Sequence, residues 1–227
     1  MKRPKIYLAC CLMLATIASM LVLRPDAKAQ YTPESMAPIE PYDHSGHGYH
    51  GMVFKTLIKD PWPSLWMMVR PSFRVEYAVI LRKIEDNGYR FHYELEYAVA
   101  EERIWNWTDI NDSVSILDLR ENVGVARKTA IIPNEIAERI VNIWKEVLKK
   151  KTRYSEKERL LGDGVYYEFY IWPYYFAGTW SPEKGIPKMM VDCGELLIQY
   201  VTAKEDQRDG ILSQIDELLK SIRSEIY

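Results

Sequence analysis

The chain has 227 residues, a formal net charge of −2 and 48% hydrophobic residues. A nearly neutral chain of this composition is typical of a globular protein and argues against nucleic acid or anionic lipid as a partner, because both attract a basic surface. The length suits one domain whose core is large enough to fold without disulfides or metal.

The first 29 residues have the features of a secretory signal peptide. Basic residues at positions 2, 3 and 5 precede an apolar run over residues 6–23, and Ala-Lys-Ala at positions 27–29 is an A-x-A cleavage site. We therefore predict cleavage after Ala29 and export to the periplasm or the medium, with no membrane attachment afterwards. An uncleaved anchor is the alternative, because the run is about as short as a membrane span can be. Cleavage would remove five of the 30 basic and one of the 32 acidic residues, which leaves a formal charge of −6.

The cysteine content indicates a bacterial exported protein. Of the three cysteines, Cys10 and Cys11 lie in the signal, so Cys193 alone remains after cleavage and no internal disulfide can form. Small secreted eukaryotic domains usually carry several disulfides, which favours a bacterial origin.

Residues 30–51 are rich in Pro, Gly, Ser and His, and they are predicted to form a flexible arm before a single domain over residues 52–227. The arm contains His44, His47 and His50, three of the chain's four histidines. Neutral imidazole binds Zn, Cu or Ni, so these three are candidate metal ligands. Their spacing matches no ordered zinc signature, and neighbouring glycines oppose a helix there. The alternative is a solvated arm whose histidines bind nothing.

The three prolines of DPWPSLWMMVRP, residues 60–71, predict a loop, because proline lacks a backbone donor and restricts its neighbours. Trp62, Trp66 and Met67 are expected to attach this loop to the core. The segment before it, residues 52–58, is expected to form a short helix or strand.

Residues 73–99 carry the clearest strand pattern, because apolar and polar residues alternate on both sides of a turn signal. A three-residue loop at Asp86-Asn87-Gly88, with its glycine in the left-handed region, would place Val79 opposite Leu95. This register brings both apolar stripes to one face, which a two-residue loop would not.

The later part of the chain predicts more strands and then helices. The helices show apolar residues at spacings of three and four, and the strands are rich in β-branched and aromatic residues. Because strands come first and helices cluster late, we expect an α+β fold, with an antiparallel sheet of about four to five strands and about three helices packed mainly on one face. These elements are strands at 114–119, 123–132 and 165–172, and helices that begin at Pro133, Pro187 and about Asp206.

The stretch VYYEFYIWPYYFAGTW, residues 165–180, is unusual because nine of its sixteen residues are aromatic. One side of this strand should face the core. The other side is too aromatic for a plain solvent face, so it is either covered by helices or binds something. Tyr and Trp favour interfaces because they join apolar area to a hydrogen-bonding tip. The candidate ligand- or partner-binding residues are Tyr170, Trp172, Tyr174, Tyr175 and Trp180.

A few residues are of the types that catalyse hydrolysis. Glu94 and Glu96 share a strand face, roughly 7 Å apart, a separation that glycosidase carboxylates use. A solvated polar sheet face is the simpler explanation. His92 is predicted to lie opposite Arg82 as an ordinary cross-strand residue. The chain has no nucleophile-elbow or phosphate-loop motif, and we predict no catalytic residue and no cofactor.

These features favour an exported bacterial protein that binds a partner without catalysis. The partner would be a protein or a glycan, and an inhibitor-like or immunity-like role is one form of this function. Two alternatives remain: a secreted hydrolase acting on envelope glycans, and a metal-binding protein that uses the histidines of the arm.

Overall fold

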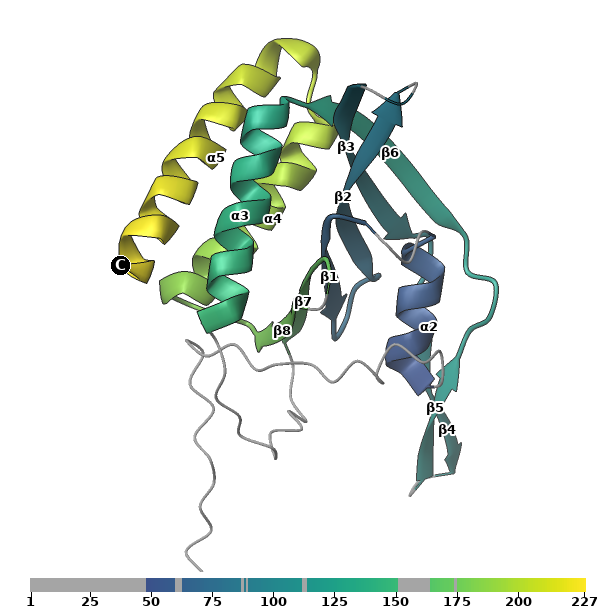
Figure 1. The fold of residues 1–227 in the computed structure, drawn as a ribbon. Helices are drawn as coiled ribbons and strands as arrows, with labels where there is room; N and C mark the ends of the chain where they lie inside the picture. Colours follow the sequence, from purple (N-terminus) through teal and green to yellow (C-terminus); the bar gives the residue numbers. More distant parts are fainter. Residues whose placement is uncertain are drawn as a thin grey trace, which may run out of the picture.

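The structure is a computed structural model and describes residues 48–59, 63–86, 88, 90–111, 114–150, 164–173 and 175–227. Its elements in chain order are α2 (Gly48–Leu57), β1 (Leu65–Pro71), β2 (Tyr77–Asp86), β3 (Arg90–Ala100), β4 (Trp105–Asn111), β5 (Val114–Leu119), β6 (Val125–Ile132), α3 (Asn134–Lys150), β7 (Val165–Ile171), β8 (Tyr175–Trp180), α4 (Gly185–Thr202) and α5 (Glu205–Ile226). Strands β6, β3, β2, β1, β7 and β8 form, in this order, one antiparallel sheet. Helices α3 and α4 cover one face of this sheet, α5 packs on these two helices, and α2 lies on the other face, so the sheet stands between two layers of helix (Figure 1).

The α+β class predicted from the sequence is confirmed. The sheet is antiparallel and three helices pack on one face, as expected. Within the described residues the main sheet has six strands instead of four to five, and α2 is a fourth helix. Strands β4 and β5 form a separate hairpin that extends from the end of the domain beside α2 (Figure 1).

Strand β1 corrects the prediction of a loop over residues 60–71. Pro63 precedes the strand and Pro71 is its last residue, so the prolines limit the strand instead of preventing it. The residues between them pair with β2 on one side and with β7 on the other. Their apolar side chains are buried on both faces, which is the pattern of a central strand.

The β2–β3 hairpin has a loop of the predicted length, three residues, but this loop lies between Asp86 and Arg90, one residue later than predicted. Gly88 has the predicted left-handed conformation, with a φ of 83°. The register of the hairpin is displaced by one residue on each strand. Val79 therefore pairs with Tyr97, and Leu81 pairs with Leu95. The sequence pattern does not distinguish these registers, because moving each partner by two residues returns every side chain to the same face.

The first core lies between the sheet and helices α3, α4 and α5. Helix α3 turns Ile140, Trp144 and Leu148 inward, at the four-residue spacing seen in the sequence. The Trp144 ring meets Phe169 of β7 edge-on, with ring centroids 5.3 Å apart. Burying one large apolar side chain contributes about 1.5–3 kcal/mol to folding. Among the described residues, no helix has the length and apolar character needed to cross a membrane.

Helix α2 forms a second core with the opposite face of the sheet. Val53 and Leu57 of the helix pack with Trp66 and Tyr170, whose rings stack with centroids 5.5 Å apart. The helix begins at Gly48, so the last four residues of the segment predicted as an arm are helical. Its apolar contacts explain why glycine does not prevent it, since short helices take most of their stability from packing.

The packing of α4 on β1 is tight at Gly194. A side chain at Gly194 would overlap the end of the buried Met67 side chain, whereas the space around Gly210 in α5 is open. We expect Gly194→Ala to lower the free energy of unfolding by about 1–3 kcal/mol through overpacking. Gly210→Ala, the matched control, should raise it by about 0.5–1 kcal/mol through helix propensity. Urea denaturation followed by tryptophan fluorescence measures both, and equal effects would contradict the close packing of α4 on β1.

Candidate functional site

The aromatic segment of β7 and β8 is divided between the core and the surface. Tyr170 is 3% exposed and belongs to the second core under α2. Trp172, in the turn between the strands, is 45% exposed, and Tyr175 and Trp180 are half-buried. Tyr174 lies outside the described residues. Of the four described candidates, Trp172 is the most accessible to a partner.

The histidines of the N-terminal segment are described in part. His50 lies in α2, and its Nδ1 is 3.0 Å from Oε1 of Glu168 in β7. His44 and His47 lie outside the described residues. In the part of the chain that the structure describes, no group of three or more His, Cys, Asp and Glu side chains is placed to hold a metal ion. Metal binding by the three histidines therefore stays a prediction.

His50 belongs to a group of partly or fully buried polar side chains beneath α2. Arg70 of β1 forms an ion pair with Glu168, which has no exposed surface. The Arg70 guanidinium lies 5.5 Å from the Tyr49 ring centroid and 4.7 Å from the Tyr166 ring centroid. A buried ion costs several kcal/mol unless it is paired. Here the opposite charge and the two aromatic faces supply that compensation.

Tyr49 connects this group to a second buried carboxyl, that of Glu76. The Tyr49 hydroxyl donates to Glu76 at 2.8 Å, and the backbone N–H of Ile104 donates to the same carboxyl at 3.0 Å. Burial raises the pKa of the Glu76 carboxyl and of the Tyr49 phenol, because the charged forms lose hydration. The first turn of α2 is thus fastened to the sheet by residues that are far apart in the sequence.

The acidic strand face also holds structural ion pairs. Glu96 is buried, and its two oxygens accept from Arg82 and Arg127. Arg127 in addition donates to the carbonyl of Thr56, near the end of α2, at 3.2 Å. Glu94 lies opposite Arg82 in the sheet. The carboxyl of Glu96 therefore serves as an ion-pair partner that helps to hold α2.

The remaining reactive side chains singled out in the sequence are engaged within the fold. His92 lies opposite Ile84, and not opposite Arg82 as predicted, because of the displaced register. Its Nδ1 contacts the Asp86 carboxylate at 2.8 Å. Cys193 is buried in α4, and burial raises the pKa of its thiol to about 12, which keeps the thiol protonated at neutral pH.

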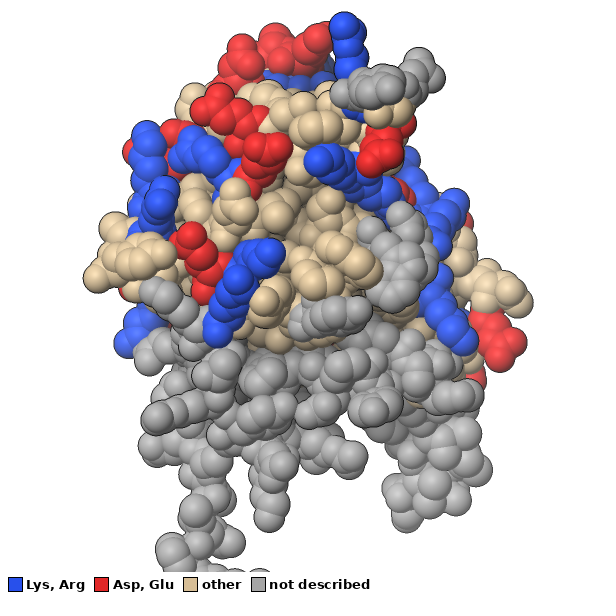
Figure 2. Space-filling model, viewed as in Figure 1, with Lys and Arg blue, Asp and Glu red and all other residues tan. Residues whose placement is uncertain are grey.

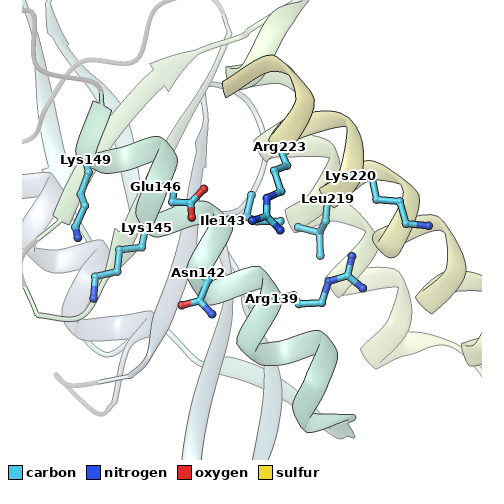
Figure 3. Close-up of a pocket in the computed structure, with 9 residues that line it drawn as sticks. All are labelled: Arg139, Asn142, Ile143, Lys145, Glu146, Lys149, Leu219, Lys220 and Arg223. Carbon is cyan, nitrogen blue, oxygen red and sulfur yellow. The ribbon is translucent and has the colours of Figure 1, made fainter. Parts of the chain in front are cut away.

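A groove between α3 and α5 has the size of a ligand site. Its volume is about 470 Å³, within the range of about 300–1,000 Å³ that is usual for small-molecule sites. Figure 3 shows Arg139 and Arg223 between the two helices, with lysine side chains of both helices projecting outward. The residues that line the groove are Arg139, Asn142, Ile143, Lys145, Glu146, Lys149, Leu219, Lys220 and Arg223.

The groove is basic although the whole chain is slightly acidic. Five of its nine lining residues are Lys or Arg and one, Glu146, is acidic, whereas the formal net charge of the chain is −2. Beside the groove, Asp216 pairs with Arg139 and Lys220, and hydrogen bonds from Lys220 and Arg139 lower the pKa of Asp216. Figure 2 shows lysine and arginine side chains along the left side of the view, over the helix layer, and acidic side chains gathered at its top.

The groove adjoins the aromatic segment at Lys149. The Lys149 ammonium lies 5.5 Å from the ring centroid of Tyr175, the first residue of β8. Tyr175 follows the turn that contains Trp172. A basic surface and an aromatic surface therefore meet at the end of α3. From the sequence alone these lysines are expected only as charges at the end of a helix, because nothing in the local sequence indicates that α3 packs against α5.

The protein is an α+β domain with helices on both faces of its sheet, and it carries a basic groove that adjoins the aromatic residue Tyr175. Comparisons with protein-family models, with curated protein sequences and with solved structures find no match to this chain. The function is therefore inferred from the residues and the structure of the chain itself.

Glu76 should make stability fall as the pH rises. Its folded-state pKa lies above the ordinary value of 4.5. The folded protein therefore holds a proton that the unfolded chain has already released, and stability is lost as the pH rises through the folded pKa. Glu76→Gln removes the titration. Its amide oxygen can accept from the Ile104 N–H, and its NH2 group can donate to the Tyr49 hydroxyl. We expect the variant to gain stability relative to the wild type as the pH rises above the ordinary value of that carboxyl.

Urea denaturation at a series of pH values measures this difference. The control is Glu121→Gln, because Glu121 lies in an exposed turn between β5 and β6. A difference between wild type and Glu76→Gln that stays constant with pH would contradict the protonated, buried carboxyl.

Proposed function

We propose that this is an exported protein that binds another protein and does not catalyse a reaction. Its binding surface includes Trp172, in the turn between β7 and β8, and Tyr175 at the start of β8. The observation that carries the proposal is the 45% exposure of Trp172, because the other tryptophans whose side chains the structure describes are buried or half-buried. Tryptophan is among the residues most enriched at the energetic centres of protein interfaces.

The state of the reactive side chains supports binding over catalysis. Glu96 is held by two arginines, His92 contacts Asp86, and Cys193 is buried with a raised thiol pKa. A nucleophile or a general acid must reach a substrate, whereas these groups are occupied by the fold.

Export is supported by the N-terminal sequence, with its basic start, apolar run and A-x-A site that ends at Ala29. Cys193 is a buried free thiol. A domain whose core is built without disulfides, as this one is, suits a bacterial exported protein.

Trp172→Ala should weaken partner binding at least tenfold, because truncating an interface tryptophan commonly costs more than about 1.4 kcal/mol. The partner is first trapped by chemical crosslinking of the tagged chain in the producing cell and identified by mass spectrometry. The affinity of the purified pair is then measured by calorimetry for wild type and variant.

Phe73→Ala is the matched control. Phe73 is 69% exposed and follows the end of β1. The turn of Trp172 lies at the start of that strand, where the backbone N–H of Trp172 donates to the carbonyl of Ser64. The Phe73→Ala substitution removes a comparable aromatic surface and should leave the affinity for the partner unchanged. An unchanged affinity for Trp172→Ala, or an equal loss for both variants, would rule out the assigned surface.

A further inference from the structure

We infer that the groove between α3 and α5 binds a carboxylate-rich segment of a protein partner. This inference rests on the binding function proposed above. It adds the chemistry of the partner, which presents an acidic surface. Contact between Lys149 and Tyr175 makes the groove continuous with the aromatic surface. One partner can therefore reach both.

One guanidinium group, that of Arg223, and one ammonium group, that of Lys145, form the anion-binding centre of the groove. Arg139 of α3 and Arg223 of α5 lie between the helices (Figure 3). The ion pairs described for the lining residues are those of Arg139 and Lys220 with neighbouring carboxylates of α5. The charges of Arg223 and Lys145 are thus left for a ligand. A guanidinium binds a carboxylate through two parallel hydrogen bonds, which adds geometric specificity to charge.

Two acidic groups at the groove reduce its net positive charge. Glu146 lines the groove, and Asp216 lies beside it. A phosphate carries about −1.5 to −2 charges at neutral pH, and both its attraction to the five cations and its repulsion by these groups exceed those of a single carboxylate. The competition experiment below therefore separates the two kinds of ligand.

The shape of the groove suits a segment of chain. Arg139 pairs with Asp216, and the Tyr227 hydroxyl donates to Glu146 at 3.3 Å. Residue numbers therefore increase in the same direction along both helices, so α3 and α5 run parallel and form a linear groove. Lysine side chains project from both sides of it (Figure 3). A linear groove with charged rims accommodates an acidic peptide segment along its length.

The same cations have a second role that needs no ligand. The carboxyl ends of the parallel helices α3 and α5 lie at one end of the groove, and cations there interact favourably with the helix dipoles. This role predicts an effect on stability alone, whereas ligand binding predicts an effect on affinity. Measuring both quantities on the same variants separates the two roles.

The experiment uses a fluorescent oligoglutamate peptide of about ten residues as the probe, with anisotropy as the readout. We expect the folded protein to bind it with an affinity that falls as salt is added. Arg223→Glu and Lys145→Glu should each weaken binding about fivefold or more, and the double variant should weaken it further. Lys128→Glu is the matched control, because Lys128 is exposed on the edge strand β6 and undergoes the same charge change.

Four outcomes would overturn the inference: no binding of the peptide, an equal loss for Lys128→Glu, a loss of stability without a loss of affinity, and stronger competition by polyphosphate or by vesicles of anionic phospholipid than by unlabelled peptide. The Trp172 measurement is independent of this one. If the peptide fails to bind while Trp172→Ala loses the partner, the groove alone is rejected. If the peptide binds while Trp172→Ala retains the partner, the aromatic surface alone is rejected.

Discussion

The burial of strand β1 on both faces is the constraint on which the three layers depend. Leu65, Met67 and Val69 face the helices α3, α4 and α5, while Trp66 and Met68 face α2. Each core therefore takes one side of the same strand. Because β1 also lies between β2 and β7 in the sheet, the hairpin of the first half of the chain is joined through it to the aromatic strands of the second half. A strand with one solvated face would support a single core.

The second core combines apolar contacts with buried charges, and this combination fixes the place of α2. The ion pair of Arg70 with Glu168 lies near the start of the helix, where His50 joins it. Arg127, which is paired with Glu96, reaches the helix near its other end. Buried ion pairs often stabilise a fold no more than apolar packing of equal volume. Positions of the helix that would leave a buried charge unpaired are nevertheless disfavoured. The ion pairs near the two ends of this ten-residue helix therefore add to the apolar contacts of Val53 and Leu57 in fixing its position.

The same use of charges shapes the functional proposals. Side chains that could perform chemistry, such as Glu96 and His92, are engaged with neighbours in the fold. The surface features that the proposals use are an exposed tryptophan and a groove with an excess of cations, which adjoin through Lys149 and Tyr175. Recognition of an acidic protein needs these features and does not need a catalytic group.

The sequence by itself determined the elements whose signals are local. Helices α3 and α5, strand β7 and the left-handed Gly88 follow from apolar spacing and turn chemistry, which act over a few residues. Tertiary structure decided the rest. It turned a proline-bounded loop into the central strand, moved Tyr170 from a candidate surface into a core, and gave His50 a carboxylate partner more than a hundred residues away. It also brought α3 beside α5 to form the groove. Contacts between residues far apart in the chain produce no periodic pattern in the sequence, because many of the same residue types occur in buried contacts and on solvated surfaces.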